Sequence, residues 1–400
     1  MSEPNRPPIE GLRVIDSSTV IAGPTIGMLM GDFGADVIKV EHPRGDPLRN
    51  TGYQKDGVGL WFKMANRNKR GITLNFNTPR GQELFKSLVR TADVVIENFR
   101  TGTMEKWGLG WEDLRSINPK LVMVRVTGFG QTGPYKNRPG FGTIAEAFSG
   151  FASMTGEADG PPTLPNFGLA DGIAAAYGTF ATMFALYHRD AKGGSGQYID
   201  LSIYEPLFQV LGPQPLQFDQ LGIIQERLGN RSKNNAPRNT YRTRDGHWVA
   251  ISTNSPAIVK RVMTLCGGKV AAEDPRFQTP QDRVAHIDEV DGIVASWIGR
   301  HDLQVVLEEF EKAEAAIGPA YDIGQIFQDP QYQARGNIIE VLDDDLGPIK
   351  MTNAFPFMSE TPAEIRHAGP RKGEHNRDIL VGELGLSEQD LAELEKDGVI

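Results

Sequence analysis

The chain carries LRVIDSSTVIAGPTIGMLMGDFGADVIKV at residues 12–40. Residues 12–15 form a short apolar run that predicts a strand, and the Ala22-Gly23-Pro24 segment predicts a turn. The residues that follow predict a helix up to Gly34, and residues 36–40 predict the next strand. A helix between two such strands is typical of a parallel sheet, whose neighbouring strands need a crossover connection.

The same alternation of strand and helix continues along the first half of the chain. Thr78-Pro79 predicts a helix start, because a proline at the first helical position loses no hydrogen bond. We therefore expect an α/β fold with a Rossmann-like parallel sheet. Further apolar runs predict strands at residues 72–74, 93–97, 121–127 and 198–202.

The composition changes in the second half of the chain. Residues 225–239 are polar, and residues 241–252 predict a hairpin that turns at Asp245-Gly246. Helical patterns follow, and short strands return near the carboxyl terminus. The expected division is a large domain at 1–200, a linker at 201–224, a smaller α+β middle domain at 225–325 and a return to the large domain at 326–400.

Composition and charge exclude several classes of protein. Hydrophobic residues make up 39% and charged residues 23%, as in ordinary globular proteins, and the net charge of −9 gives no sign of a nucleic-acid surface. The one cysteine, Cys266, cannot form an internal disulfide, which indicates a reducing compartment. The apolar residues 173–187 are too few to span a membrane. We expect a cytoplasmic protein without nucleic-acid or membrane partners.

Several common catalytic motifs are missing from the sequence. No GxGxxG opens the first helix and no GxxxxGK[ST] occurs, which argues against the usual nucleotide sites. There is no GxSxG and no HExxH, and the seven histidines are scattered. We therefore expect no metal.

Asp171 is the carboxylate that could carry chemistry. It stands in GLADG at residues 168–172, after a Gly/Pro-rich loop and at the start of an apolar helix rich in small residues. An aspartate there is most often an N-cap, worth about 1 kcal/mol. A helix start can also stabilise an acyl oxyanion or a thiolate, and small neighbours leave room for a substrate. The pattern alone leaves both interpretations open.

Nine segments, in this order and spacing, resemble one family. The chain is similar to the class III CoA-transferases, the family of formyl-CoA transferase and carnitine CoA-transferase, with α-methylacyl-CoA racemase as a relative. The segments are AGP at 22–24, GADVIKVE at 34–41, NRNKRGITLN at 66–75, ADVVIENF at 92–99, GPPT at 160–163, Asp171-Gly172, SGQYIDLS at 195–202, GP at 318–319 and GEH at 373–375.

The resemblance implies a reaction in which coenzyme A moves from an acyl-CoA to a free carboxylic acid. Asp171 would be the nucleophile and would pass through an aspartyl acyl anhydride and an aspartyl-CoA thioester. It also implies a large domain made from both chain ends and an interlocked homodimer. Coenzyme A would be a co-substrate, and succinyl-CoA is one candidate donor.

The resemblance further implies where CoA binds. Val20, Ile21 and Ala22 would approach the thiol arm. The nucleotide end would be lined by Leu74, Asn98, Phe99 and Arg100, with Lys106 near a phosphate, and Arg67, Lys69 and Arg70 have the charge that suits the 3′-phosphate. A solvated basic loop is the alternative for each of these cations.

Departures from the formyl-CoA transferase pattern bear on the acceptor. Ile21 stands where that pattern has Gln, Phe141-Gly142 replaces a Tyr-Glu pair, and residues 229–235 replace a glycine run. We therefore expect an acid larger than oxalate. A dicarboxylate that pairs with Arg231, Lys233 or Arg238 is one hypothesis.

Two other functions remain open. A racemase needs a proton-abstracting pair, typically with a histidine at the position of residues 140–143, and none is present there. A CoA-binding subunit without chemistry, as part of a heteromeric transferase, would have no need of Asp171. The transferase is the favoured function.

Overall fold

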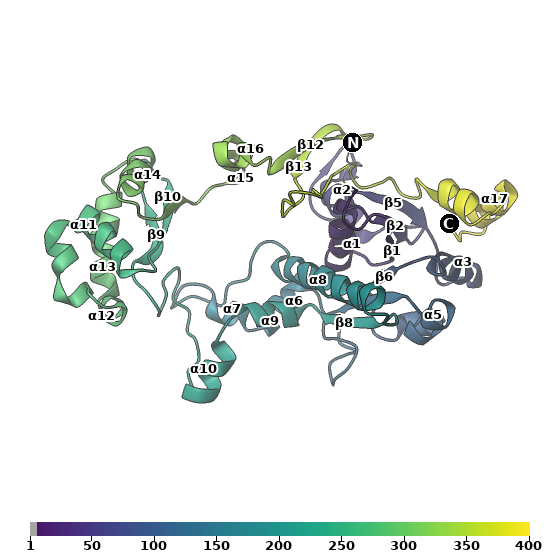
Figure 1. Cartoon of the computed structure of the whole chain (residues 1–400), viewed down its shortest axis with the longest axis horizontal. Coiled ribbons are helices and arrows are strands. Elements are labelled where there is room, and N and C mark those ends of the chain that lie inside the picture. The colour runs from purple at the N-terminus through teal and green to yellow at the C-terminus, as the bar shows by residue number, and fades with distance from the viewer. Residues whose placement is uncertain (1–5) are drawn as a thin grey trace. The chain divides into compact units, whose positions relative to one another are not determined.

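The computed structural model describes residues 6–400, and its contacts divide the chain into two compact units (Figure 1). The first unit is built from the residues up to Phe151, from Leu164–Leu216 and from Gln333–Ile400. The second consists of Ala152–Thr163 and Gln217–Tyr332. Both ends of the chain thus contribute to the first unit.

The predicted domain boundaries differ from these units in detail. Residues 201–224, predicted as a linker, contain the helices α9 (Tyr204–Val210) and α10 (Gln214–Leu221). The Ala152–Thr163 segment belongs to the second unit, which the composition did not indicate. The predicted domain boundaries themselves stay a prediction.

The first unit is centred on a parallel sheet of six strands, as the alternation of strands and helices predicts. Its order is β5-β2-β1-β6-β7-β8, so strands are added first on one side of β1 and then on the other. The strands are β1 (Arg13–Asp16), β2 (Asp36–Glu41), β5 (Lys69–Thr73), β6 (Val94–Glu97), β7 (Val122–Thr127) and β8 (Tyr198–Ser202). The Rossmann-like α/β fold is confirmed.

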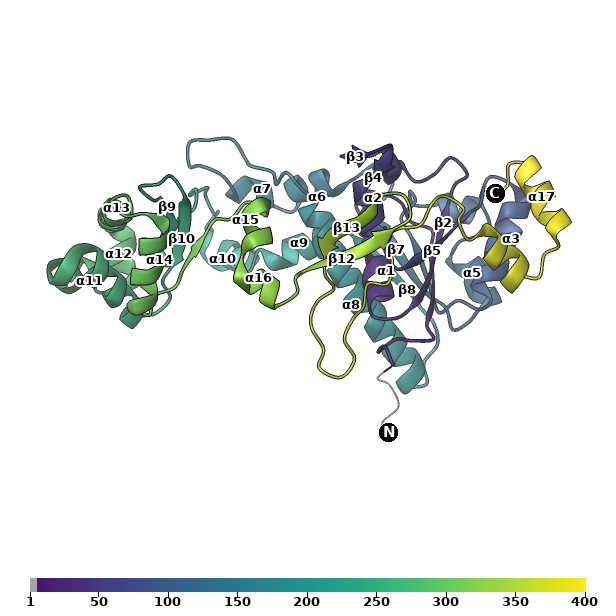
Figure 2. The ribbon, with the colours of Figure 1, turned by 90° about the horizontal axis from the view of Figure 1, so that it is seen from above.

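Helices cover both faces of the sheet because its central strands are apolar on both sides. Val14 packs on one face with α1 (Ala22–Asp32) and α8 (Leu169–Ala191). Ile15 packs on the other with α3 (Pro79–Val89), α5 (Trp111–Ile117) and α17 (Glu388–Lys396). Figure 2 shows α3, α5 and α17 together on one side of the strands and α1 on the other.

The predicted turn at Ala22-Gly23-Pro24 is wrong in position. These residues are the first three of α1, and the turn lies just before them. A Cβ on Gly23 would meet the Ser18 side chain at 2.3 Å, so the residue allows the helix to start against the strand end.

The carboxyl-terminal segment returns to the sheet through the GEH motif. The backbone N–H of His375 donates to Gly71 O at 2.9 Å, and Gly71 N–H donates to the His375 ring at 3.1 Å. Asn376 accepts from Thr73 N–H at 2.9 Å. The motif therefore attaches the chain end to β5. A hairpin of β12 (Ile338–Asp343) and β13 (Gly347–Thr352) precedes it.

The second unit is a small α+β structure. Its sheet order is β11-β10-β9, all antiparallel, and the predicted hairpin at Asp245-Gly246 joins β9 to β10. Burial raises the pKa of Cys266 to about 12, which supports its structural role. The elements are β9 (Arg238–Arg242), β10 (Trp248–Ser252), β11 (Ile317–Pro319), α11 (Pro256–Glu273), α12 (Pro280–Ala285), α13 (Ile287–Ile298) and α14 (Leu303–Lys312).

Helix α8 is longer than the 173–187 run suggests. By length and composition alone it could cross a membrane. Its small residues, however, face α1 and the sheet: a Cβ on Gly178 would meet Ile26 at 2.5 Å and Leu201 at 2.9 Å. The close approach identifies this side of α8 as part of the core of the first unit.

Candidate active site

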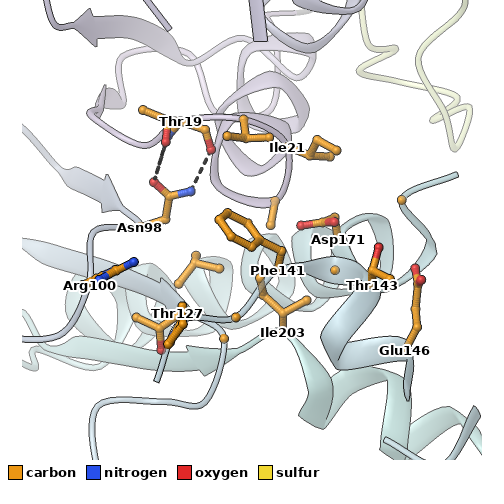
Figure 3. Close-up of a pocket in the computed structure, with 18 of the residues that line it drawn as sticks. Thr19, Ile21, Asn98, Arg100, Thr127, Phe141, Thr143, Glu146, Asp171 and Ile203 are labelled. Carbon is orange, nitrogen blue, oxygen red and sulfur yellow. Dashed lines mark hydrogen bonds between the residues drawn. The ribbon is translucent and has the colours of Figure 1, made fainter. Parts of the chain in front are cut away.

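A cavity of about 530 Å³ lies in the first unit, where the strand order reverses between β1 and β6. Its wall is formed by Thr19–Ala22 after β1, by Asn98–Thr101 after β6 and by Val126–Gly128 at the end of β7. Asp171, at the start of α8, completes it (Figure 3). Open α/β sheets bind ligands in the crevice at this point of the topology.

The turn after β1 is strained and is held by hydrogen bonds. Val20 has φ of +67°, a conformation that a β-branched residue rarely adopts. Asn98 accepts from Thr19 N–H at 2.8 Å and donates to Thr19 O at 2.7 Å, and Asp46 accepts from Val20 N–H at 3.2 Å. Figure 3 shows the two hydrogen bonds of Asn98. The Asn98 side chain therefore clamps the loop after β6 to the loop after β1.

Buried ion pairs support the same turn from beneath. Lys39 pairs with Asp46 at 3.0 Å and donates to Ser18 O, and Lys69 pairs with Asp16 at 2.8 Å. All four charged side chains are inaccessible to solvent. Burial lowers the pKa of Lys69 to about 8, although Asp16 opposes that change. Both lysines support the turn from inside the unit, and neither lines the cavity.

The loop after β6 is fixed by a second buried charge. Glu97 accepts from Phe99 N–H at 2.8 Å and pairs with Arg125 at 2.8 Å. The Phe99 ring packs edge-on against Trp107 with centroids 5.1 Å apart. At the cavity wall, the Thr101 hydroxyl is buried with no partner among the described residues. An incoming polar ligand could satisfy it.

Asp171 is the third residue of α8 and does not cap the helix. The N-cap position is Gly168, and no side chain caps it, so the capping interpretation is wrong. Among residues 6–400, no group donates a hydrogen bond to the Asp171 carboxylate and no cation pairs with it. Burial, and secondarily the charge of Glu146, raise its pKa to about 6.

Glycines and one apolar side chain make room for this carboxylate. A Cβ on Gly142 would lie 2.0 Å from Asp171 Oδ2, so the carboxylate packs directly on that backbone. A Cβ on Gly168 would lie 3.4 Å from Ile21 Cδ1 and 3.5 Å from Asp171 Oδ2, so both side chains lie against Gly168. The Ile21 side chain offers no hydrogen-bond donor, and no group within residues 6–400 donates to either Asp171 oxygen.

Seven of the ten predicted site residues line this cavity. They are Val20, Ile21, Ala22, Asn98, Phe99, Arg100 and Asp171. Sequence reasoning missed others of the lining, among them Thr19, Lys136, Arg138, Thr143 and Glu146, and it named Phe141 only for its bearing on the acceptor. Most of these lie in the 128–149 stretch, whose Gly-rich composition indicates a loop but not which strand ends it approaches.

Three predicted CoA-binding residues do not line the cavity. Arg70 is paired with Asp36 at 2.7 Å and with Glu383 at 2.5 Å. Leu74 is 1% exposed within the core, and Lys106 lies on the surface at the end of α4 (Thr103–Lys106). The other two cations of the NRNKRG segment are also engaged within this unit, because Arg67 pairs with buried Asp32 and Lys69 with buried Asp16.

Other cations surround the cavity instead. Arg100, Lys136 and Arg138 are exposed, and none forms an ion pair with a carboxylate among residues 6–400. Arg138 stacks on Tyr135 at 3.7 Å. Unpaired cations beside a cavity are suited to phosphate groups. No histidine occurs among the described residues that line it, so a proton-abstracting imidazole is missing there.

The cations proposed for a dicarboxylate are engaged within the second unit. Arg231 pairs with Asp288 and Asp291, both at 2.8 Å, and Lys233 pairs with Glu226 at 3.1 Å. Arg238 donates to backbone carbonyls at 3.0 Å. Arg231 and Lys233 are already paired with carboxylates and Arg238 is bonded to backbone carbonyls, so the structure does not support this part of the hypothesis.

Comparison with known proteins decides the family. The family model described as CoA-transferase family III matches residues 9–376. The chain belongs to that family. It is 43% identical over 398 residues to succinyl-CoA–D-citramalate CoA-transferase of Chloroflexus aurantiacus, with 98% of each chain covered. Family members use acyl-CoA as a co-substrate, and within residues 6–400 no cluster of potential metal ligands occurs.

Two further relatives bear on assembly and fold. The chain is 40% identical over 398 residues to the beta subunit of succinyl-CoA–L-malate CoA-transferase of the same organism, with 98% of each covered. A crystal structure of a CAIB/BAIF family protein from Brucella suis superposes with a TM-score of 0.84 and 34% identity, covering 94% of this chain and 99% of that one.

Proposed function

We propose that this CoA-transferase moves CoA from succinyl-CoA to a dicarboxylic or hydroxy-dicarboxylic acid, with Asp171 as the nucleophile. The observation that carries the proposal is the Asp171 carboxylate, which has no hydrogen-bond or ion-pair partner within residues 6–400 and lies on the wall of the cavity at the strand reversal. Relatives named for succinyl-CoA donors match almost the whole chain, which supports this donor.

In the first half of the reaction CoA is transferred from the donor acyl group to Asp171. An Asp171 oxygen attacks the thioester carbonyl carbon, the C–S bond breaks, and the electron pair leaves on sulfur as the CoA thiolate. The thiolate then attacks the Asp171 carbonyl carbon of the anhydride. The donor acid leaves as its carboxylate, and Asp171 now carries CoA as a thioester.

In the second half the acceptor repeats these steps in reverse. Its carboxylate attacks the Asp171 thioester and releases the CoA thiolate, which attacks the acceptor carbonyl of the new anhydride. Acyl-CoA of the acceptor and free Asp171 result. An ionised Asp171 is needed at the start, which the pKa of about 6 provides at neutral pH.

The rest of the cavity would hold the CoA chain. The strained turn at Val20 presents backbone and apolar surface to the thioester arm, and Thr101 supplies a hydroxyl without a partner in the described structure. Arg100, Lys136 and Arg138 would take the phosphates of CoA.

We also propose a homodimer, interlocked as the family resemblance implies. The outer side of α8 exposes Tyr177, Phe180, Phe184 and Tyr187, from 36% to 59% each, and α10 contains no buried residue. Aromatic surfaces of this kind usually mark an interface. Light scattering over a hundredfold dilution tests it: a monomer at any concentration would contradict the proposal.

Trapping the acyl-enzyme tests the chemistry. The protein is incubated with succinyl-CoA, quenched with hydroxylamine and analysed by intact and peptide mass spectrometry. We expect a hydroxamate at Asp171 that Asp171→Asn lacks while still binding CoA. An unlabelled Asp171 after incubation with turnover-competent donor and acceptor would exclude it as the nucleophile.

A further inference from the structure

Glu146 differs from every other buried acid in the part of the chain that the structure describes. Within residues 6–400, seven of the eight buried carboxylates form an ion pair with lysine or arginine: Asp16, Asp32, Glu41, Asp46, Glu97, Asp291 and Asp343. Glu146 is 2% exposed and has no such partner in that range. A buried charge without a counterion costs several kcal/mol, so its retention calls for a functional reason.

The carboxylate of Glu146 is positioned by the helix that carries Asp171. Its Oε1 accepts from Ala170 N–H at 3.2 Å, in the first turn of α8 and directly before Asp171. Four residues earlier on α6 (Gly142–Phe148), the Gly142 backbone contacts Asp171 Oδ2. Residues i and i+4 share one side of a helix, so α6 touches the start of α8 with a single face.

Both carboxylates belong to the same cavity. Glu146 and Asp171 line it together, and Figure 3 shows them on neighbouring helices with Thr143 beside them. The other ionisable side chains of the lining are Arg100, Lys136 and Arg138. Apart from burial, Glu146 is the group that raises the pKa of Asp171 to about 6.

We propose that Glu146 is a positioning residue for Asp171: it fixes the first turn of α8 and keeps an uncompensated negative charge beside the nucleophile. This rests on the proposed function. When Asp171 attacks the thioester, its negative charge moves to the carbonyl oxygen and then to the departing sulfur. Repulsion from Glu146 is present in the resting enzyme and relieved along this path, so it favours the acyl-enzyme.

Glu146→Gln and Glu146→Asp separate the two contributions. Glutamine keeps an oxygen that can accept from Ala170 N–H but removes the charge, whereas aspartate keeps the charge and shortens the side chain. Glu112→Gln is the matched control, because it removes the same charge from a side chain that is 82% exposed on α5.

The experiment has two readouts. The ionisation of Asp171 is followed by ¹³C NMR of labelled aspartate carboxyls, with the signal assigned by Asp171→Asn. Acyl-enzyme formation is followed in single turnovers with succinyl-CoA from pH 5 to 8. For Glu146→Gln we expect the midpoint of the Asp171 titration to fall by about one pH unit. We also expect the rate of acyl-enzyme formation at pH 8 to fall about tenfold. Glu146→Asp and Glu112→Gln should keep a midpoint near 6.

The outcomes distinguish this inference from the proposed function. A folded Glu146→Gln with an unchanged midpoint overturns the inference. If Glu146→Gln does not fold, a Glu146→Asp midpoint at the ordinary aspartate value of 3.8 overturns it too. Absence of any acyl-enzyme in the wild type contradicts the proposed function instead, while the NMR midpoints still decide whether Glu146 acts on Asp171.

Discussion

Gly142→Ala places one methyl group against the proposed nucleophile. Its Cβ would lie 2.0 Å from Asp171 Oδ2 and 3.0 Å from Asp171 Cγ, where ordinary contact begins at 3.4 Å. The backbone of α6 is held by its own helix, so the carboxylate is the group that must move. Gly172→Ala is the matched control, because a Cβ there meets nothing within 4 Å and Gly172 does not line the cavity.

The size of the effect follows from this overlap. The carboxylate must retreat by about 1.4 Å to restore contact at 3.4 Å from the new Cβ, and a displacement of about 1 Å can cost a reaction about a hundredfold. We therefore expect acylation to slow about a hundredfold in Gly142→Ala. Gly172→Ala should keep its rate and gain about 0.5–1 kcal/mol of stability, because alanine is the better helix former.

Single-turnover acylation at saturating succinyl-CoA measures the chemical step, and calorimetry measures CoA affinity. Gly142→Ala should change the rate and leave the CoA Kd within about threefold, since the methyl group meets the nucleophile. Thermal unfolding checks that both variants are folded. A folded Gly142→Ala that acylates at the wild-type rate would show that the position of the Asp171 carboxylate does not matter to the reaction. An equal loss of acylation rate in Gly172→Ala would refute the reasoning as well.

Three further predictions concern the cavity wall and the pH response. Asn98→Ala removes the two hydrogen bonds that join Asn98 to Thr19 in the strained turn and leaves the bond from Val20 N–H to Asp46, so we expect a KM for acyl-CoA at least threefold higher and a smaller change in kcat, measured in steady state. Asp171→Asn should stabilise the protein against urea at pH 8. The pKa of Asp171 in the folded protein, about 6, lies above the ordinary 3.8, so folding disfavours the ionised carboxylate above pH 6. The gain in free energy of unfolding should therefore shrink as the pH falls from 6 towards 4. Lys39→Met leaves Asp16 and Asp46 without this cation and should cost about 3–5 kcal/mol in urea unfolding; a loss under 1 kcal/mol would contradict the role of the buried pairs.

Four strands of the parallel sheet, β1, β2, β6 and β7, could be predicted because each is a short apolar run. The run at 36–40, for example, appears as β2 with one residue added, Glu41, whose carboxylate is buried against Arg49. A fifth strand, β5, begins three residues before the predicted run at 72–74, with Lys69, Arg70 and Gly71. Polar residues buried by ion pairs carry no such local signal. Lys69 and Arg70 show this, because their partners lie 53 and 34 residues away in the chain. The basic residues of this segment therefore predicted a phosphate site, whereas the structure contains ion pairs that hold the fold together.

Asp171 has a local signal in the sequence, whereas Glu146 has none. The Gly-rich surroundings of Asp171 distinguish it locally, and the family resemblance supplies its role. Glu146 stands in an ordinary helical sequence, and its burial arises only when α6 packs on the start of α8, 24 residues later. A single sequence contains no periodic signal for a pair of this kind.

The distribution of charge pairs connects the fold to the reaction. Around the turn after β1, acids such as Asp16 and Asp46 are neutralised by buried lysines, which lets a strained Val20 persist. At the start of α8, Asp171 and Glu146 have no cation among the described residues. A cation beside Asp171 would stabilise its ionised form and weaken it as a nucleophile. The reaction therefore needs two different arrangements of charge: neutralised acids that keep the cavity wall rigid, and unpaired carboxylates at the nucleophile.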